Sequence, residues 1–423
     1  MNRWSPAVPL LSAALAACGG SSDTTAPPVT PMASAAPTSS APAEVASASP
    51  AATPSAAPST PPPDTTPPLP NPFADADFYV NPDFVAQVEK TAKATPAQAA
   101  AIRKVEAFPT AVWMDSIAKT KSVGHYLEGA EAQAKKSGKP TLILFVLYDL
   151  PARDCSATAS AGELDVATGE AKYKDQFLAP IVEQFKAHPS LRIVTILEPD
   201  SLPNIATNTD KPKCASADPV YRHSIAAAIK ALQLPNVSVY LDAAHAGWLG
   251  WDGNREKIAK IFKSVLDDAG GPGTIHGFAT NVSNYDPPSG GDAKRLESSN
   301  PSADEITYTQ KLAESLAKVG VANKAFIIDT SRSGKGGIRS SGGSWCNVKG
   351  AGIGERPRAA PAPGIDAFWW VKPPGESDGA ADPKAPGFDK GCSGGDAAPG
   401  APQAGKWFTT YFVDLVKNAN PPL

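Results

Sequence analysis

Acidic side chains follow several short apolar runs of this sequence. In RIVTILEPDS the run Arg192–Leu197 is followed by Glu198 and Asp200, and Asp154 and Asp378 follow two other runs. Cleavage of a glycosidic bond needs one protonated carboxylic acid and one carboxylate. Crowding carboxyl groups in a cleft of low dielectric keeps one of them protonated near neutral pH. Tryptophans lie among these acids and offer flat surfaces for sugar rings, so the residue types predict a glycosidase.

Seven apolar, β-rich runs alternate with stretches whose apolar residues recur every three or four positions. The runs are Ala111–Met114, Thr141–Tyr148, Arg192–Leu197, Val237–Leu241, Gly277–Thr280, Ala325–Ile328 and Ala367–Val371. The helical stretches are Tyr126–Lys136, Lys172–Ala187, Pro219–Leu232, Asn254–Asp268, Ala303–Val319 and, at the C-terminus, Trp407–Leu415. Strands that are apolar throughout and alternate with helices predict an α/β fold with a parallel sheet covered on its outer face. Seven units favour a closed or nearly closed β/α barrel, with a doubly wound open sheet as the alternative.

Both architectures bind ligands at the carboxyl ends of their strands. Polar residues follow every run, in chain order Asp115; Tyr148, Asp149, Arg153 and Asp154; Glu198 and Asp200; Asp242, His245, Trp248 and Trp251; Asn281 and Asn284; Asp329 and Arg332; Lys372, Glu376 and Asp378. One such residue alone is more often a cap or turn former than a ligand. Seven sets of polar residues gathered at one face of a barrel predict a functional site. Asp149, Glu198 and Asp329 are also candidates for buried carboxylates that hold loops.

Other chemistries leave no trace in the sequence. GxSxG, HExxH, P-loop and zinc-type cysteine spacings are absent, so we expect no metal and no cofactor. The net charge is −3 and no basic patch stands out, which argues against nucleic acid as a partner. Of the adjacent Trp369 and Trp370, at least one is expected in the core, as is Trp407.

The N-terminal segment reads as an export signal and a tether. Residues 1–18 combine Arg3, a short apolar stretch and Leu15-Ala16-Ala17-Cys18, which resembles a bacterial lipobox; an ordinary cleaved signal is the alternative. Residues 19–70 are a linker rich in Pro, Ala, Ser and Thr, predicted to be disordered. Residues 71–423 form the predicted catalytic domain. These features predict an exported monomer, either a cell-surface lipoprotein anchored to the outer membrane through a lipid on Cys18 or a secreted protein.

Four cysteines remain after Cys18. An even number in an exported chain suggests disulfides. Four cysteines allow three pairings, of which the sequence-local one joins Cys155 to Cys214 and Cys346 to Cys392.

The chain from about residue 71 onward resembles glycoside hydrolase family 6, the cellulases. The segments that carry the resemblance are VWMDS, YDLPARDCSATASAGE, ILEPDSLPNIATN, LDAAHAGWLGW, ATNVSNY, DTSRSGK, WCNVKGAGIGERP and WWVKPPGESDG. The resemblance implies a distorted, partly open β/α barrel of seven parallel strands. It also implies hydrolysis of β-1,4-glucan with inversion of the anomeric configuration.

The resemblance also implies roles for individual residues. Asp200 matches the general acid, Asp154 the neighbouring carboxylate that raises the pKa of the acid and organises water, and Asp378 the candidate base, acting directly or through a water chain. Tyr148 matches a tyrosine beside the distorted sugar, and Ser160 a mobile position linked to the water. The residues that match sugar contacts are Trp113, Asp242, Lys372 and Glu376 around the cleaved and non-reducing-side sugars, and His245, Trp248, Trp251 and Trp345 on the leaving-group side. Asp115 and Asn281, which follow the first and fifth runs, are further candidate substrate contacts.

The family contains cellobiohydrolases and endoglucanases, which differ in two loops that cover the cleft. The long segments Cys155–Cys214 and Cys346–Cys392 resemble the cellobiohydrolase pattern, so we expect a tunnel that releases cellobiose from non-reducing ends. An open-cleft endoglucanase is the alternative, and a non-catalytic glucan-binding lipoprotein is a third hypothesis. The chain departs from the family in lacking a recognisable carbohydrate-binding module and in having Ser377 where Cys is frequent.

Overall fold

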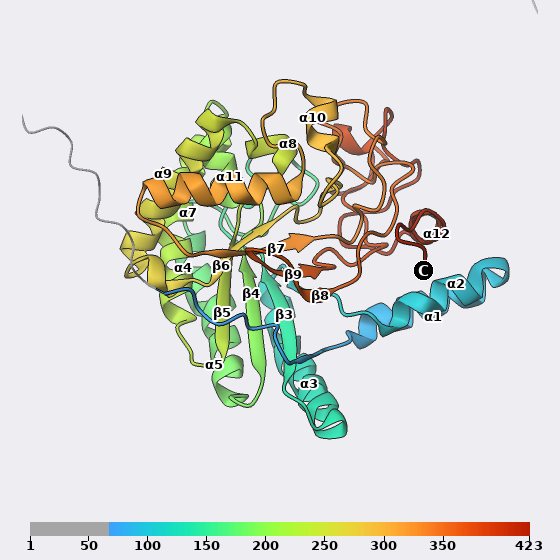
Figure 1. Cartoon of the computed structure of the whole chain (residues 1–423), viewed down its shortest axis with the longest axis horizontal. Helices are drawn as coiled ribbons and strands as arrows, with labels where there is room; N and C mark the ends of the chain where they lie inside the picture. The colour runs from blue at the N-terminus through green and yellow to red at the C-terminus, as the bar shows by residue number, and fades with distance from the viewer. Residues whose placement is uncertain (1–66) are drawn as a thin grey trace, which may run out of the picture. The chain divides into compact units, whose positions relative to one another are not determined.

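The computed structural model describes residues 67–423. One curled sheet lies at its centre, with most helices packed outside it (Figure 1). The strands are β1 (Asp77–Phe78), β2 (Val112–Met114), β3 (Thr141–Leu147), β4 (Arg192–Leu197), β5 (Val237–Asp242), β6 (Gly277–Thr280), β7 (Ala325–Asp329), β8 (Arg358–Ala362) and β9 (Ile365–Trp369). The α-helices are α1 (Pro82–Ala94), α2 (Ala99–Arg103), α3 (Val123–Ser137), α4 (Gly169–Lys172), α5 (Ala179–Ala187), α6 (Ser201–Thr207), α7 (Pro212–Ala231), α8 (Ala246–Leu249), α9 (Asp252–Ala269), α10 (Asp292–Leu296), α11 (Glu305–Lys318) and α12 (Thr409–Lys417). A π-helical segment, Tyr173–Leu178, joins α4 to α5.

The sheet is a partly open parallel barrel, as predicted. The strand order is β1-β3-β4-β5-β6-β7-β9-β8, and β2 pairs with β3 beyond the end of β1. All pairs are parallel except β8 with β9. Between β2 and β9 the barrel is bridged by the Ala111 N–H, which donates to the Trp370 carbonyl at 3.1 Å, and by the Trp113 indole, which donates to the Val371 carbonyl at 2.8 Å. The seven predicted parallel strands are therefore present, and the doubly wound alternative is wrong.

The strands are apolar throughout because both of their faces are buried. In β3, Leu142, Leu144 and Val146 point into the barrel, while Ile143 and Phe145 pack against the helices. This alternation follows from the two-residue period of a strand. The barrel interior is thus a packed core, and only the carboxyl ends of the strands are left to form a site.

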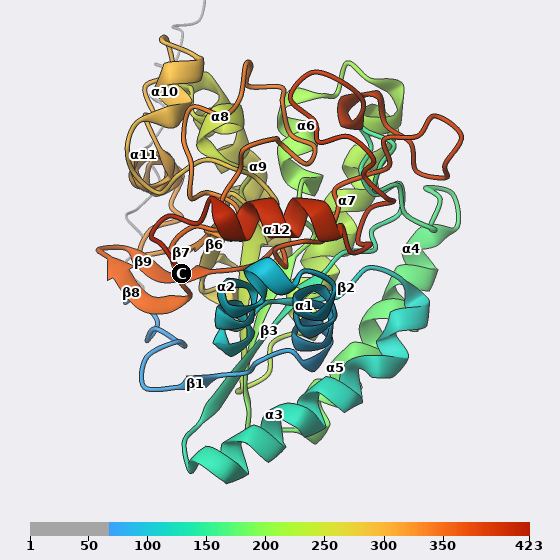
Figure 2. The same cartoon turned by 90° about the vertical axis from the view of Figure 1, so that its right-hand side faces the viewer.

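A second core lies outside the barrel. Helix α12 packs over α1 and α2 (Figure 2), through a cluster that includes Phe84, Val88 and Phe412. Trp370 is fully buried in this cluster, and Trp369 is fully buried in the barrel, so both are structural. Trp407 also packs in the second core, where its indole donates to Thr91 Oγ1 at 2.9 Å.

Several predicted helix boundaries differ from the structure, two of them for a clear reason. Helix α7 begins at Pro212 rather than at Pro219, because the first proline occupies the first turn and the second lies inside the helix, where its missing N–H costs one backbone bond. The C-terminal helix begins at Thr409, so Trp407 precedes it. Strands β1 and β8 were not predicted, since β1 has two residues and β8 carries an arginine and a proline on an edge.

The predicted signal segment 1–18, with its lipobox Cys18, and all of the predicted linker except residues 67–70 lie outside the described residues. Among residues 67–423, no helix combines the length and the apolar character needed to cross a membrane.

Candidate active site

A large cleft opens at the carboxyl ends of the strands. Its cavity volume is about 710 Å³. Twelve of the predicted site residues line it: Trp113, Asp115, Tyr148, Asp154, Ser160, Asp200, His245, Trp248, Trp345, Lys372, Glu376 and Asp378. The parallel strands therefore bring these distant segments to one place, as the sequence pattern predicted.

The backbone around the cleft is unusual. Non-glycine residues with left-handed φ values cluster at the strand ends: Ala152 (57°), Asp154 (55°), Glu198 (49°), Asp200 (65°), Ala244 (53°), Asn281 (61°) and Ser283 (59°). Such conformations are uncommon for residues with a Cβ and concentrate at functional sites. Glu198 and Asp200 flank Pro199, and this pair of left-handed turns directs the two carboxyl groups to different places.

Glu198 points away from the cleft. It is buried, and its two oxygens accept from the N–H groups of Asp149 and Leu150 at 3.3 and 3.2 Å. Burial raises the pKa of Glu198 to about 7. Glu198 thus holds the turn after β3, as the sequence suggested for a buried brace.

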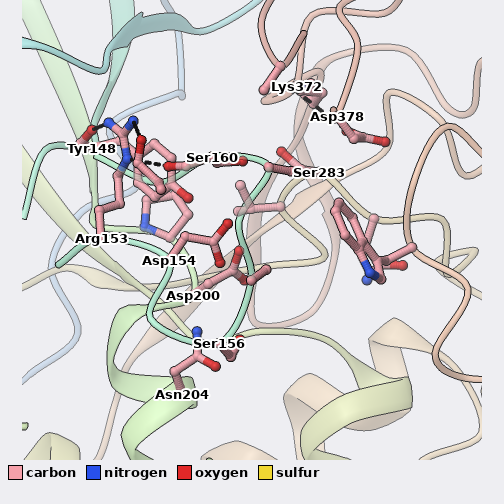
Figure 3. A pocket seen from close by; sticks show the side chains of 18 of the residues that line it. Tyr148, Arg153, Asp154, Ser156, Ser160, Asp200, Asn204, Ser283, Lys372 and Asp378 are labelled. Atoms are coloured by element: carbon pink, nitrogen blue, oxygen red, sulfur yellow. Dashed lines mark hydrogen bonds and ion pairs between the residues drawn. The ribbon is translucent and has the colours of Figure 1, made fainter. Parts of the chain in front are cut away.

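Asp200 faces the cleft and is surrounded by other acids. Burial, followed by the charges of Asp242, Asp154 and Asp378, raises the pKa of Asp200 well above its usual range. Figure 3 shows Asp154 beside Asp200, with Asp378 on the other side of the pocket near Lys372. A carboxyl group that stays protonated near neutral pH can donate a proton to a leaving oxygen.

Asp242 lies beneath Asp200 rather than in the lining of the cleft. Its Oδ2 accepts from the Asp200 N–H at 2.9 Å and from the Ala244 N–H at 3.2 Å. Burial raises the pKa of Asp242 to about 7. Asp242 is not in the lining of the cleft, and both hydrogen bonds of its Oδ2 are internal, so its sugar contact stays a prediction.

The loop that carries Asp154 is held by Arg153. The guanidinium donates to the carbonyls of Asp115 and Ser160, at 2.6 and 2.8 Å, contacts that of Tyr148, and lies 4.5 Å from the centre of the Tyr148 ring. The buried Asp149 carboxyl group lies 3.5 Å from the same guanidinium. Burial raises the pKa of Asp154. Arg153 therefore ties β2, β3 and the Ser160 loop together around Asp154.

Asp378 is held in the ionised form. Its Oδ2 accepts from Arg332 Nη1 at 2.7 Å, from the Tyr285 hydroxyl at 2.9 Å and from the Asn347 N–H at 2.8 Å. Lys372 Nζ lies 3.7 Å from Oδ1. Burial opposes ionisation, but the charges of Arg332 and Lys372 and the Arg332 hydrogen bond outweigh it, so the pKa of Asp378 is lowered. The two acids of the cleft are therefore poised in opposite protonation states.

Aromatic rings line the cleft. Trp113 is fixed by its bond to the Val371 carbonyl and stands edge to face with Tyr148, with centroids 5.5 Å apart. Trp248 is fixed by a bond from its indole N–H to Thr207 Oγ1 at 2.9 Å. Flat, fixed indoles suit a chain of sugar rings.

Two loops meet over the cleft. Thr158 donates to Asp389 Oδ2 through its N–H at 3.0 Å and through Oγ1 at 2.9 Å. A Cβ added at Gly387 would lie 3.2 Å from the Ala159 carbonyl oxygen, so the loops also pack closely. Cys155–Cys214 and Cys346–Cys392 are disulfides, which settles the three possible pairings in favour of the sequence-local one. We call residues 156–161 and 386–392 the roof loops.

Asn281 does not lie in the lining of the cleft, so its sugar contact stays a prediction. Asn281 is fully buried, and its Nδ2 donates to the Asp286 and Asp329 carbonyls, both at 2.8 Å, while its Oδ1 accepts from the Asp286 N–H. Both N–H donors of the Asn281 side chain are therefore engaged inside the protein. Asn284, three residues later, lines the cleft instead. Trp251 also lies outside the lining and donates to Ser299 Oγ at 3.3 Å.

Several lining residues were missed from the sequence. They include Asn204 and Asn208, Ser283 and Lys211. Asn204 and Asn208 are four residues apart and therefore share one helical face, a signal that was available. Asp329 is not in the lining; it accepts from the N–H groups of Ser283, Ser331, Val371 and Lys372, as expected of a carboxylate that holds loops.

Among the described residues, one group of three side chains has the spacing to hold a metal ion: His245, Asp286 and Glu305. His245 Nδ1 lies 2.8 Å from Asp286 Oδ2, and Arg339 contacts Asp286 Oδ1. A cation would have to displace these partners, so the group reads as a hydrogen-bonded network.

Comparisons with known proteins agree with this geometry. The model for glycosyl hydrolases family 6 matches residues 73–419. The chain belongs to this family. It is 41% identical over 357 residues to Exoglucanase 3 of Agaricus bisporus, covering 84% of this chain and 80% of the relative. It is likewise 41% identical over 356 residues to the putative endoglucanase type B of Fusarium oxysporum, covering 83% and 77%.

A solved family 6 structure has the same fold. Cellobiohydrolase II of Humicola insolens, in complex with glucose and cellotetraose, is 38% identical to this chain with a TM-score of 0.80. The match covers 84% of this chain and all of that one (100%). The partly open barrel is therefore the family 6 fold.

Proposed function

We propose that this chain hydrolyses the β-1,4-glucosidic bonds of cellulose with inversion and releases cellobiose from non-reducing chain ends. Asp200 is the general acid that protonates the leaving oxygen. Its position carries the proposal, because it is an acid at the cleft floor whose pKa lies well above its usual range beside two other carboxyl groups. An acid of this kind is required for glycosidic cleavage.

Asp378 is the candidate base and Asp154 organises water beside the acid. Inversion needs a carboxylate across the sugar ring from the acid, with room for a water between. Asp378 meets the first condition, since it is ionised and lies on the far side of the pocket from Asp200 (Figure 3). Its Oδ2 is occupied by three donors, which leaves Oδ1 to accept a proton, directly or through Ser160-bound water.

We assign the sugar contacts to side chains that line the cleft. In this proposal Trp113, Lys372 and Glu376 contact the non-reducing side, and Asp115 and Tyr148 lie near the cleaved ring. His245, Trp248 and Trp345 contact the leaving-group side. Lys372 Nζ lies 5.6 Å from the centre of the Trp113 ring, so a sugar that stacks there also meets a cation.

The roof loops support action on chain ends. A cleft covered by two disulfide-anchored loops admits a polymer by threading rather than by lateral binding. The names of relatives support action on chain ends only in part, since one is called an exoglucanase and another a putative endoglucanase. Open-cleft endoglucanase action is therefore the alternative within the same chemistry.

Export is a further part of the proposal. Residues 1–18 act as a signal, Cys18 carries a lipid that anchors the monomer to the outer membrane, and residues 19–70 are the tether between anchor and enzyme. Metabolic labelling with a radioactive fatty acid tests this, because Cys18→Ser would lose the label and be released in soluble form. If the wild-type chain carries no label, the conclusion is that the enzyme is secreted without a lipid anchor.

The variant Asp200→Asn tests the central assignment. Its amide cannot donate the proton, so turnover on swollen cellulose falls by about 10²–10⁴, the usual contribution of general acid catalysis. Binding of cellotetraose, measured by calorimetry, stays within about threefold because the asparagine keeps the shape of the site. Near-normal release of reducing sugar would refute the role of Asp200. If the wild-type chain itself binds cellotetraose but releases no sugar, the result would favour a glucan-binding lipoprotein.

A further inference from the structure

One buried arginine connects two side chains of the cleft. Arg339 lies in the segment between β7 and β8 and is 3% exposed. Its Nη1 donates to Asn284 Oδ1 at 3.0 Å, and its Nη2 contacts Asp286 Oδ1 and lies 3.4 Å from Asp292 Oδ2. A guanidinium has donors and no acceptor. Each oxygen that faces it must therefore be an acceptor.

This requirement orients Asn284. Its Oδ1 accepts from Arg339 and also from the Tyr285 N–H at 2.7 Å. With the oxygen fixed on the protein side, the amide NH₂ is the end left for the cleft that Asn284 lines. Oxygen and nitrogen of an amide are assigned from such networks. Asn284 is thus a hydrogen-bond donor toward the substrate.

The same arginine determines the state of His245 through Asp286. Asp286 is fully buried, and Oδ2 lies 2.8 Å from His245 Nδ1. Burial opposes its ionisation, but the contacts with His245 and Arg339 lower the pKa of Asp286 to about 2. A carboxylate only accepts, so His245 Nδ1 must carry a proton. A neutral imidazole has one N–H, which leaves Nε2 as an acceptor.

The residue after His245 is also fixed by a hydrogen bond. Ala246, at the start of α8, donates its N–H to Glu305 Oε1 at 2.6 Å. Burial and the charge of Asp286 raise the pKa of Glu305 well above its usual range, so this carboxyl is neutral. The groups around the His245 ring are thus the Asp286 carboxylate, the neutral acid Glu305 and the Arg339 guanidinium. Asp292 lies beyond them.

We propose that Arg339 is a positioning residue that makes the leaving-group side of the cleft a matched pair: an acceptor at His245 Nε2 and a donor at Asn284 Nδ2. Such a pair recognises a sugar hydroxyl, which donates to the first and accepts from the second. The identity of the ligand rests on the proposed function. The tautomer of His245 does not, because it follows from the unliganded network.

Selective ¹⁵N labelling of histidine tests the tautomer in the full chain without substrate. The chain has 5 histidines, and the spectrum of His245→Gln identifies the signal of interest. In the wild type, at a pH where the ring is neutral, we expect a protonated Nδ1 and a bare Nε2. A protonated Nε2 would overturn the proposal, whatever the enzyme hydrolyses.

The variant Asp286→Asn gives a sharper test. Arg339 requires an oxygen, so the amide must present its NH₂ to His245 Nδ1, and the ring must move its proton to Nε2. Replacing an aspartate beside a histidine by asparagine reverses the tautomer in this way in the serine protease triad. We expect the reversed tautomer and a loss of about tenfold in kcat/KM on cellotetraose, the scale of one misdirected hydrogen bond.

A double variant isolates Arg339. In Asp286→Asn with Arg339→Met nothing forces the amide orientation, so the Nδ1–H tautomer returns in at least part of the population. Arg295→Met is the matched control, since Arg295 donates to Asp292 at 3.0 Å and to the Arg339 carbonyl at 3.4 Å, and its loss leaves the Arg339 guanidinium and Asp286 in place. It should leave tautomer and kcat/KM unchanged. An Asp286→Asn enzyme that keeps Nδ1–H, or a double variant that fully keeps Nε2–H, would contradict the role of Arg339.

Discussion

The backbone N–H of Asp200 donates to Oδ2 of Asp242 at 2.9 Å, so a second carboxyl group lies directly beneath the proposed acid. After burial, Asp242 is the largest contributor to the raised pKa of Asp200, ahead of Asp154. The sequence suggested that the acid is set by one partner on the neighbouring strand. The structure instead gives it a partner on each side, β5 beneath it and the Ser160 loop beside it.

Asp242→Asn should therefore shift the pH–rate profile. Removing a negative charge lowers the pKa of Asp200, so the acid loses its proton at lower pH and the alkaline limb moves to lower pH. The amide oxygen still accepts from the Asp200 N–H, and kcat at pH 5 should stay within about tenfold of wild type. Initial rates on cellotetraose between pH 4 and 9 measure this. An unmoved alkaline limb would mean that Asp242 has no electrostatic role.

Asp149 makes stability depend on pH. Burial raises the pKa of Asp149 to about 8. Between its unfolded pKa and pH 8 the folded chain holds a proton that the unfolded chain has released, so stability is complete at low pH and declines as pH rises. Asp149→Asn keeps the shape and cannot ionise. It should raise the melting temperature at pH 8 and change it little at pH 5; equal changes at both pH values would contradict the assignment.

The contact between the roof loops should control how the polymer enters. Thr158→Val removes the Oγ1 bond to Asp389 and keeps the side-chain volume. We expect the ratio of viscosity loss on carboxymethylcellulose to soluble sugar released to rise roughly threefold, the scale of one weak hydrogen bond. Thr168→Val is the control, because Thr168 makes a similar 2.8 Å bond to Asp165 away from the roof. An unchanged ratio in Thr158→Val would exclude this contact as a gate.

The disulfide Cys346–Cys392 should hold the roof as well as the fold. It closes a separation of 46 residues. Replacing both cysteines by serine should cost about 2–4 kcal/mol of stability and increase endo-type cleavage. Viscosity and thermal unfolding, measured together, separate the two effects. Lower stability with an unchanged cleavage pattern would assign the disulfide to the fold alone.

Much of the fold could be predicted because the barrel strands are long, apolar and regularly spaced. Strands β3 and β4 followed from their apolar runs, and the turn to Asp200 followed from Pro199 just after β4. The roof contact of Thr158 with Asp389 could not, since it joins loops 231 residues apart in sequence. Asn281 and Asn284 could not be distinguished either, because only the turn geometry decides which amide is buried. The family motifs located most site residues, but not the internal bonds that withdraw Asp242 and Asn281 from the cleft.

The most direct test of the account is a time-resolved product analysis on phosphoric-acid-swollen cellulose with detection of the anomers. We predict cellobiose as the main soluble product from the earliest times, formed first as the α-anomer. Initial formation of the β-anomer would contradict the acid and base assigned to Asp200 and Asp378. An early mixture of longer oligosaccharides, with the α-anomer retained, would keep the chemistry and replace the tunnel by an open cleft.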